Sequence, residues 1–457
     1  MAVPTLSDTI VAPATPAGVG AIAVIRVSGK NAIEITDQIF FGKDLTQVPS
    51  HTLHFGTIQD ENGEIIDEVL VSVFREPHSF TRENCTEISC HGSPYIVEQI
   101  LKLLLAKGAR MAEAGEFTKR AFLNGRFDLT QAEAVADLIA ADSQAAHRVA
   151  MQQMRGGFSK KIQELRNELI RFASLVELEL DFAEEDVEFA NRNELKAFLQ
   201  NVMNYVSELL QSFAWGNVLK NGIPTAIVGK PNAGKSTLLN ALLQEEKAIV
   251  SDIAGTTRDI IEDEMLLEGI RFRFIDTAGL RDTQDVIEAI GVERAKQKMQ
   301  EASLVLYLVD SSEIHENLEN LQKELQSLQK PYFILFNKID KLSAESIAEL
   351  EKIPNALCIS AKEQQGIEKL KNALTELVKR QKVSNSDIVV SNVRHYKALS
   401  KTQEALQKVL SDIDTAITTD LLAADIRQAI RYLGEIIGEV SSEDLLDYIF
   451  SKFCIGK

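Results

Sequence analysis

The residues GKPNAGKS at positions 229–236 follow the strand-like TAIV at 225–228 and precede the helix-like residues 237–243. Gly229 and Gly234 let backbone N–H groups close around phosphate oxygens, and the N-terminus of the helix adds its positive dipole end. A strand, a glycine-rich loop and a helix in this order are the context of a phosphate-binding loop. The middle of the chain is therefore predicted to be a nucleotide-binding α/β unit with a parallel sheet.

Side chains of this loop supply the charge and the metal ligand that a triphosphate needs. Lys235 offers a point charge to the β and γ phosphates, and the Ser236 hydroxyl is expected to bind magnesium. The loop residues predicted to lie at the nucleotide are Asn232, Ala233, Gly234, Lys235, Ser236 and Thr237.

A second phosphate-contacting segment reads DTAG and follows the apolar residues 270–275, so that Asp276 stands at the end of a strand. Its carboxylate can hold magnesium through the ion's water shell, and Gly279 can turn its N–H toward the γ phosphate. The predicted contacts from this segment are Asp276, Thr277, Ala278 and Gly279.

The base is selected by NKID at 337–340, which follows the apolar residues 333–336. The Asp340 carboxylate can accept from both N1–H and the 2-amino group of guanine, a donor pair that adenine lacks, so GTP is favoured over ATP. After residues 356–359, backbone N–H groups of a short SAK segment are expected to face guanine O6. The predicted base contacts are Asn337, Lys338, Asp340, Ser360, Ala361 and Lys362.

A switch segment, GTTRD at 255–259, lies between the loop and DTAG. Thr257 is the candidate there for binding magnesium when the γ phosphate is present. Leu280 stands where other GTPases carry a water-orienting glutamine, and leucine cannot do this polar work. Hydrolysis therefore needs another arrangement.

Two nearby side chains can provide that arrangement. The Asn232 side-chain oxygen can take part in the shell of a monovalent cation, whose charge would replace that of an arginine finger. Glu288, a carboxylate just downstream, can orient the attacking water. Arg258 and Arg281 remain alternative sources of positive charge.

The composition is that of an ordinary globular protein. The chain has 457 residues, 45% hydrophobic and 25% charged, and its length predicts about two to four domains. A net charge of −18 argues against a large surface that binds nucleic acid through phosphate neutralisation alone. A local patch can still bind RNA.

Cysteine usage and the chain ends favour the cytoplasm. Four cysteines without zinc-ligand spacing are no disulfide framework in so long a chain. The chain shows no basic region followed by an apolar run and no stretch of about 18 apolar residues. The terminal CIGK has the outline of a prenylation box, but Gly456 is not aliphatic and Lys457 is not a usual last residue. We expect a cytoplasmic protein without membrane attachment.

Changes of pattern along the chain suggest a multidomain organisation. Residues 1–118 mix short apolar strands with one helix, which predicts an α+β domain. Residues 119–220 and 381–457 have helical periodicity, and the α/β unit at 221–380 separates them. We therefore predict one discontinuous all-α domain into which the α/β domain is inserted.

Several helices can be placed more closely. Ser93 is expected to cap, and Pro94 to begin, the helix of the first domain. Thr130 and Glu133 form a capping box for a helix that continues to Met154. A bundle helix is predicted by the apolar stripe Ile162, Leu165, Leu169, Phe172 and Val176. Further helices are expected at about 193–219, 393–411, 420–433 and 442–453. The acidic residues 181–188 are either a metal or partner site or a solvated turn between helices, and the turn is favoured.

The motifs GKPNAGKS, GTTRD, DTAGLR and NKID, with FCIGK at 453–457, resemble the MnmE (TrmE) family of tRNA modification GTPases over the full length of the chain. The segments DTIVAPATPAGVGAIAVIRVSG and GEFTKRAFLNGRFDLTQAEAVADLI are similar to the family's N-terminal and helical parts. The resemblance implies an N-terminal folate-binding domain that mediates dimerisation, a discontinuous all-α domain, and an inserted Ras-like G domain that depends on potassium.

The resemblance also implies a reaction. Together with an FAD-dependent, NADH-using partner, MnmG (GidA), in a heterotetramer, the family modifies carbon 5 of the wobble uridine in certain tRNAs. The added group is aminomethyl or carboxymethylaminomethyl, and the one-carbon donor is 5,10-methylenetetrahydrofolate or a related reduced folate. Implied cofactors are GTP, Mg²⁺, K⁺ and this folate.

By the same resemblance, potassium would be held by Asn232, Ser251, Ile253 and Thr256, and magnesium by Ser236 and Thr257, while Glu288 would orient water. The folate site would use Arg26, Glu87, Arg126 and Lys457. Relatives commonly have lysine at position 126, so arginine keeps the charge and changes the contact geometry. A pterin presents an amide N–H beside an amino group, as guanine does, and Glu87 can accept both.

The terminal tail carries two expectations. Lys457 can reach the folate site only if the tail folds back against the first domain. Cys454 either approaches the modification chemistry, with Lys457 as the electropositive neighbour of a thiolate, or serves as a small apolar anchor beside Phe453 and Ile455. An alternative function also stays open, that of an RNA-bound regulatory GTPase switch of the ribosome-assembly type, and folate binding discriminates between the two.

Overall fold

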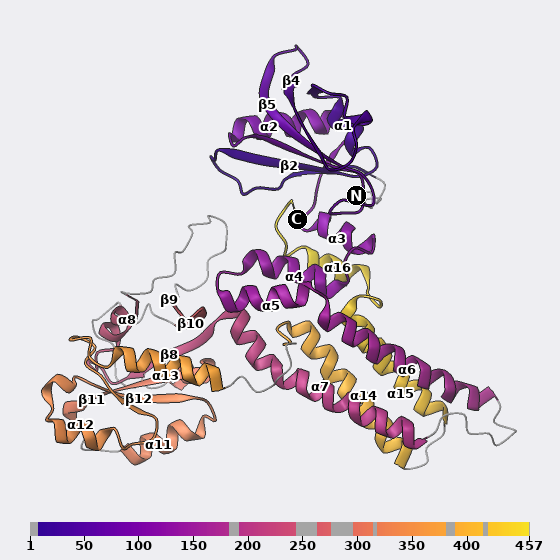
Figure 1. The fold of residues 1–457 in the computed structure, drawn as a ribbon. Coiled ribbons are helices and arrows are strands. Elements are labelled where there is room, and N and C mark those ends of the chain that lie inside the picture. The colour runs from indigo at the N-terminus through magenta and orange to yellow at the C-terminus, as the bar shows by residue number, and fades with distance from the viewer. Residues whose placement is uncertain are drawn as a thin grey trace. The chain divides into compact units, whose positions relative to one another are not determined.

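A computed structural model of the chain describes residues 8–181, 192–243, 263–275, 296–313, 318–380, 389–414 and 419–456 (Figure 1). The chain forms two compact units. The first comprises residues 1–139, 153–196 and 404–457, and the second comprises residues 140–152 and 197–403. The domain limits expected from the sequence stay a prediction.

The first unit contains a seven-stranded sheet with the order β3-β4-β5-β6-β2-β1-β7. Its strands are β1 (Ile10–Pro13), β2 (Ile22–Ser28), β3 (Phe40–Phe41), β4 (Thr52–Gln59), β5 (Ile65–Phe74), β6 (Cys85–His91) and β7 (Arg110–Met111). Neighbouring strands are antiparallel except β1 and β7, which are parallel. The sheet is therefore built largely from hairpins, with β7 added after a crossover helix.

Two helices, α1 (Ala32–Asp37) and α2 (Pro94–Ala106), supply the cover of one sheet face. Ile100 and Leu104 of α2 belong to one apolar core with alternate residues of β2, β5 and β6, such as Ile25 and Val71. The α+β prediction is confirmed. Pro94 begins α2 as predicted, but the hydroxyl of the residue before it, Ser93, accepts no capping hydrogen bond. Pro94 at the first helical position leaves one fewer N–H to satisfy at this end of the helix.

Helices occupy the predicted segments, and α3 (Glu116–Leu123) is an additional helix that was not predicted from the sequence. The others are α4 (Leu129–Ala140), α5 (Gln144–Met154), α6 (Gly157–Asp181), α7 (Arg192–Asn221), α14 (Val393–Asp414), α15 (Thr419–Ile437) and α16 (Glu443–Phe450). The predicted stripe of α6, from Ile162 to Val176, is buried, and α15 lies along α6 with Ala423, Ile426 and Leu433 buried. The repeat of apolar residues at the helical period of 3.6 residues thus predicted the helices and their buried sides.

Two details near the start of α4 differ from the sequence prediction. The capping box is formed by Asp128 and Gln131: the Asp128 carboxylate accepts from Gln131 N at 2.9 Å, and Gln131 Oε1 accepts from Asp128 N at 3.1 Å. Thr130 lies inside the helix and donates to that carboxylate at 2.6 Å. The expected continuous helix is also wrong, because the Ser143 hydroxyl accepts from Ala146 N at 3.1 Å and begins a new helix, α5.

The second unit contains a six-stranded sheet with the order β13-β12-β11-β8-β10-β9. Its strands are β8 (Ile223–Gly229), β9 (Asp263–Leu267), β10 (Ile270–Phe274), β11 (Leu304–Asp310), β12 (Tyr332–Asn337) and β13 (Ala356–Cys358). The prediction of a parallel sheet is confirmed except for β9, which is antiparallel to β10. Their turn has positive φ at Glu268 and Gly269, as a tight hairpin needs.

Helices cover both faces of this sheet. One apolar core contains Leu238 and Leu242 of α8 (Lys235–Leu243) and Leu370 and Leu374 of α13 (Ile367–Arg380). The other contains residues of α11 (Leu318–Ser327) and α12 (Ala344–Leu350). This is the three-layer, doubly covered arrangement of an α/β domain, and it places the carboxyl ends of β8, β11, β12 and β13 at one edge.

Among the helices in the described ranges, none has both the length and the apolar character needed to cross a lipid bilayer.

Candidate functional site

The glycine-rich loop leaves β8 at Gly229 and enters α8 at Lys235. A Cβ at Gly229 would lie 2.3 Å from Leu308 O, and one at Gly234 would lie 2.3 Å from Asn337 Nδ2. Both residues also have positive φ, so only glycine fits these two positions without displacing a neighbouring strand. The loop is thereby pressed against β11 and β12, and the first N–H groups of α8 are available to an anion.

Lys235 folds over this loop. Its ammonium donates to Gly229 O at 2.9 Å and to Lys230 O at 2.8 Å. Burial, and secondarily the charge of Lys298, lowers the pKa of Lys235. A half-buried cation whose partners within the described ranges are carbonyl oxygens gains strongly from a phosphate oxygen placed beside it. Ser236 and Thr237 follow in the first turn of α8, where the sequence placed them.

A buried asparagine joins the loop to the base-recognition segments. Asn337 is 3% exposed, donates from Nδ2 to Ala233 O at 2.7 Å, and accepts at Oδ1 from Ala361 N at 3.0 Å. The glycine-rich loop, NKID and SAK, which were predicted separately from the sequence, therefore meet at the Asn337 side chain. Both polar atoms of Asn337 are used, so its orientation is fixed.

Asp340 and Ser360 form the next contact of this edge. The Ser360 hydroxyl donates to Asp340 Oδ1 at 2.5 Å. That hydrogen bond is the main reason why the pKa of Asp340 is lowered, so the carboxylate is ionised and can accept two donors of a base. Lys362 is exposed beyond it, and Lys338 lies between Asn337 and Asp340 with an ion pair to Asp310. The described half of the predicted GTP site is therefore assembled.

The other predicted nucleotide residues fall outside the described ranges. They are Ser251, Ile253, Thr256, Thr257, Asp276, Thr277, Ala278, Gly279 and Glu288, together with the alternatives Arg258 and Arg281. The structure describes one of the predicted potassium ligands, Asn232, which is exposed and has a left-handed backbone with φ of 63°. It also describes one of the predicted magnesium ligands, Ser236.

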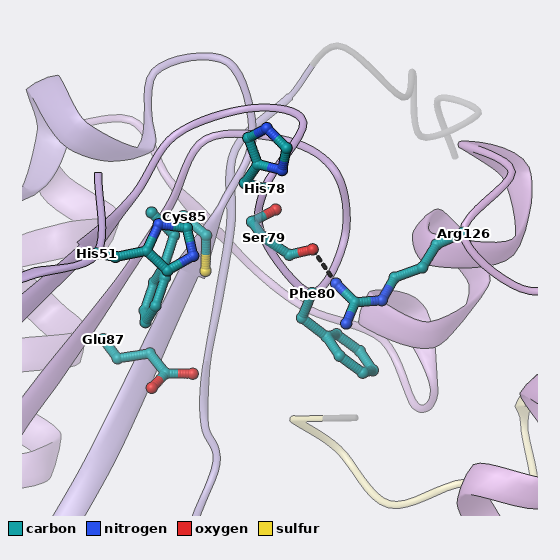
Figure 2. Close-up of a pocket in the computed structure, with 8 residues that line it drawn as sticks. His51, His78, Ser79, Phe80, Cys85, Glu87 and Arg126 are labelled. Atoms are coloured by element: carbon teal, nitrogen blue, oxygen red, sulfur yellow. Dashed lines mark hydrogen bonds between the residues drawn. The ribbon is translucent and has the colours of Figure 1, made fainter. Parts of the chain in front are cut away.

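The first unit contains a separate pocket of about 220 Å³, shown in Figure 2. Its lining residues are His51, Phe74, His78, Ser79, Phe80, Cys85, Glu87 and Arg126. Two of the four residues predicted for folate, Glu87 and Arg126, thus line one cavity. A third, Arg26, lies opposite Glu87 on the neighbouring strand and is ion-paired with it at 2.8 Å.

The charges of this pocket are distributed around an aromatic side chain. The guanidinium groups of Arg26 and Arg126 lie 5.1 Å and 5.5 Å from the Phe80 ring centroid. Arg126 also donates to the backbone oxygen of Ser79, the dashed contact in Figure 2. Burial, and secondarily Arg82, lowers the pKa of Arg126, although a guanidinium remains protonated. A carboxylate, cations and an aromatic ring suit a flat heterocycle that has amide and amino donors and an acidic tail.

Sequence reasoning missed His51, His78 and Phe80. His51 directly precedes β4, and His78 and Phe80 lie in the loop between β5 and β6. The pairing of these strands brings them to Glu87. No spacing rule connects these positions. The only local signal is the aromatic and polar HSF at 78–80, directly after Pro77.

The terminal tail lies against the first domain. Ile455 forms an antiparallel bridge with Ala114, and Cys454 O accepts from Gly115 N at 3.3 Å. Gly456 has φ of 95°, and a Cβ there would lie 2.1 Å from Pro13 O. Pro13 follows Ala12, which is paired with Arg26 across β1 and β2, so the tail ends one strand away from Arg26.

Lys457 itself lies outside the described residues. Cys454 is exposed, whereas its neighbour Phe453 is 9% exposed and packs on Phe450 with ring centroids 5.3 Å apart. Phe453 is therefore the apolar anchor of the tail, and the Cys454 thiol is left accessible.

Two family profiles match the chain. The profile described as the GTP-binding protein TrmE N-terminus matches residues 9–126, and that of the MnmE helical domain matches residues 129–454. The chain is 57% identical over 453 residues to the tRNA modification GTPase MnmE of Cytophaga hutchinsonii, covering 99% of this chain and 98% of the relative. It is 56% identical over 474 residues to that of Christiangramia forsetii, covering 99% and 100%, and 55% identical over 459 residues to that of Flavobacterium psychrophilum, covering 98% and 99%.

Among solved structures, a variant of Aquifex aeolicus Era bound to GDP·AlF4⁻ is 31% identical, with a TM-score of 0.27, over 40% of this chain and 66% of that chain. An overlap this low supports no argument about fold or function.

Proposed function

Because this chain belongs to the MnmE family of tRNA modification GTPases, we propose that it hydrolyses GTP and uses this reaction to control the modification of tRNA. The observation that supports GTP binding best is Asn337, which bridges the phosphate-binding loop at Ala233 and the base segment at Ala361. A phosphate site and a guanine-selective carboxylate, Asp340, thus share one edge of one sheet.

Nucleotide binding follows from that edge. The first N–H groups of α8 and the Lys235 ammonium neutralise the β and γ phosphates, and Asp340 accepts from the guanine edge. Ser236 and Thr257 would hold magnesium, which supplies charge neutralisation to the phosphates. Ser236 stands in the first turn of α8, directly after Lys235, as such a ligand requires.

Hydrolysis is proposed to depend on a monovalent cation. Asn232, Ser251, Ile253 and Thr256 would hold potassium, which supplies positive charge to the developing negative charge of the transition state. The exposed, left-handed Asn232 at the top of the loop supports this assignment. Glu288 would orient the attacking water. Turnover of GTP in potassium against sodium is the first test, since equal rates in both salts would leave Arg258 and Arg281 as the sources of charge.

The pocket of the first unit is proposed to bind a reduced folate that donates the one-carbon unit, 5,10-methylenetetrahydrofolate or a relative. Glu87 would accept from the amide N–H and amino group of the pterin, while Arg26, Arg126 and Lys457 would face its acidic parts. The support is that Glu87 and Arg126 line one cavity, with Arg26 paired to Glu87 and the tail seated against Pro13. The arginine at position 126 has planar donors that also stack on Phe80.

The tRNA reaction proposed is modification of carbon 5 of the wobble uridine to an aminomethyl or carboxymethylaminomethyl group. It would take place in a heterotetramer with MnmG, the FAD- and NADH-dependent partner. Cys454 is the thiol placed for contact with this chemistry, because it is exposed on a tail beside the proposed folate site. A cytoplasmic location fits the four unpaired cysteines, all of which lie in the described ranges.

A homodimer is proposed to form through the first sheet. Its face opposite α1 and α2 exposes Ile22, Leu53, Phe55 and Leu70 at 67%, 57%, 66% and 40%. These residues share one face by strand register, since Phe55 pairs with Leu70 and Leu70 with Ser89. Exposed apolar side chains that share one sheet face in this way fit a second copy of the same chain.

Folate binding separates this function from the alternative, an RNA-bound regulatory switch, which has no use for the Glu87 pocket. Calorimetry with a stable reduced folate is expected to show binding that Arg26→Ala and deletion of residues 454–457 both weaken. Absence of binding to the wild-type protein would favour the switch. Wobble-nucleoside analysis of tRNA from cells that lack the protein then tests the reaction itself.

A further inference from the structure

The turn that carries the base-recognition residues has an unfavourable backbone. Lys338 follows the end of β12 and has φ of 67°, in the left-handed region that a residue with a Cβ rarely adopts. Asp340, which faces the base, comes two residues later in the single 3₁₀ turn η4 (Ile339–Lys341). The direction in which Asp340 points therefore depends on how firmly the backbone at Lys338 is held.

The neighbouring strand holds Lys338 at two points. Asp310 ends β11 directly opposite Asn337 of β12. Its Oδ2 accepts from Lys338 Nζ at 2.5 Å, and the next residue, Ser311, donates from Oγ to Lys338 O at 3.0 Å. One contact restrains the side chain of Lys338 and the other restrains its backbone, so the end of β11 clamps the turn.

Asp310 is itself oriented. Its Oδ1 accepts from Ser312 N at 3.0 Å and from Ser312 Oγ at 2.6 Å, which leaves Oδ2 for Lys338. The Asp310 side chain is 12% exposed and that of Lys338 is 29% exposed, so water screens the pair only partly. Although burial raises it, hydrogen bonds from Lys338 and Ser312 bring the pKa of Asp310 down to about 2. Asp310 is therefore an anion at neutral pH.

We propose that Asp310 is a positioning residue for guanine recognition, which fixes Lys338 and, together with Ser311, sets the turn that presents Asp340 to the base. This inference rests on the proposed binding of GTP and deepens it, because the sequence motifs assign no role to Asp310. Asp310 acts through Lys338, and its effect concerns the base. It is therefore equal for GDP and GTP and does not involve the γ phosphate or the chemical step.

The test uses the full-length protein and dissociation of N-methylanthraniloyl-GDP, with steady-state GTP turnover beside it. Asp310→Asn removes the charge and keeps the acceptor for Ser312. We expect dissociation of the fluorescent GDP to become about tenfold to a hundredfold faster, the loss expected for one charge-assisted hydrogen bond. KM for GTP should rise by a similar factor while kcat at saturating GTP stays within about twofold, a split that general destabilisation would not give.

A matched control comes from the same unit. Glu351→Gln removes the same charge from an exposed ion pair with Lys369, whose N–O distance is 3.2 Å, and should leave GDP dissociation unchanged. If Asp310→Asn fails to fold, Ser311→Ala decides, because it deletes only the hydroxyl bound to Lys338 O and should speed dissociation by about threefold to tenfold.

The outcomes are distinguishable. Wild-type protein that does not bind the fluorescent GDP would overturn the proposed function together with this inference. Wild-type binding with unchanged dissociation in Asp310→Asn, or in Ser311→Ala where that variant decides, would overturn the positioning role and leave the GTPase proposal intact.

Discussion

Asn337 and Ala233 are 104 positions apart in the sequence, yet Asn337 Nδ2 donates to Ala233 O at 2.7 Å in the interior of the second unit. The same side chain accepts from Ala361 N. In the proposed function these two segments bind the phosphates and the base, so the Asn337 amide would couple phosphate binding to base selection.

Replacing Asn337 with alanine tests this coupling. It leaves a buried carbonyl at Ala233 and a buried N–H at Ala361 without their partner, which costs about 1–3 kcal/mol for each group. We expect GDP affinity to fall by at least about tenfold and the thermal midpoint of the nucleotide-free protein to fall as well. Asn372→Ala, at an exposed position of α13, is the control and should change neither. Normal GDP affinity in Asn337→Ala would contradict the coupling.

Gly456 permits the second prediction. Its left-handed backbone and the 2.1 Å approach of a Cβ to Pro13 O mean that Gly456→Ala must displace the tail. We expect folate affinity to fall as far as it does on deletion of residues 454–457, while GTP turnover stays normal. Gly63→Ala is the matched control, since Gly63 also has positive φ but nothing lies within 4 Å of its added Cβ. Folate affinity at the wild-type level in Gly456→Ala would show that the seating of the tail does not matter.

Motifs read in one stretch were well predicted from the sequence. GKPNAGKS, NKID and SAK each follow a strand, and the sheet order brings them to one edge, because parallel strands end together. Residues that depend on pairing between distant strands were not predicted from motifs, and Arg26 and Glu87 came only from the family resemblance. In the sequence, Asp310 is an acidic residue at the end of an apolar strand, and nothing there indicates its partner. Its position opposite Asn337 follows only from the pairing of β11 with β12. The break between α4 and α5 was missed because the helical periodicity of the sequence continues across it. The Ser143 hydroxyl accepts from Ala146 N and so begins the new helix α5.

The third prediction concerns the buried Arg120 of α3, which is 1% exposed and ion-paired with Asp8, Glu83 and Glu116 at 2.6, 3.1 and 3.0 Å. Arg120→Met removes one of the two arginine partners of Asp8 and Glu116, the other being Arg110, and also the arginine that pairs with Glu83. It should destabilise the first unit by about 3–5 kcal/mol. Hydrogen exchange at the amides of β1 and α3 measures this loss. Arg171→Met, which removes a surface pair with Glu168, is the control.

The same cluster predicts a pH dependence. Burial opposes ionisation, but hydrogen bonds from Arg110 and Arg120 lower the pKa of Asp8 from 3.8 and that of Glu116 from 4.5. Carboxyls with a depressed pKa contribute stability that is fully present above their ordinary values and is lost as the pH falls through the lowered ones. The protection factors of amides in β1 and α3, which correct for the intrinsic pH dependence of exchange, should therefore fall below about pH 4 in the wild type. In Arg120→Met this fall should be smaller. An equal pH dependence in both proteins would mean that the cluster does not carry the effect.

The last prediction addresses the uncovered face of the first sheet. Phe55 and Leu70 are directly opposite each other on β4 and β5, and both are exposed. If a second copy covers this face, a glutamate at either position must be buried without a partner, which costs more than the apolar contact it replaces. Phe55→Glu and Leu70→Glu should then sediment as monomers at concentrations where the wild type is a dimer. Tyr95→Glu is the matched control, because Tyr95 is 68% exposed on α2, which packs on the opposite face of the sheet.

A dimer that survives both sheet substitutions, or a wild type that is already monomeric, would mean that this face has a different occupant. Since Arg26 and Glu87 lie on the same face by strand register, monomeric variants should also show whether folate affinity depends on the second copy.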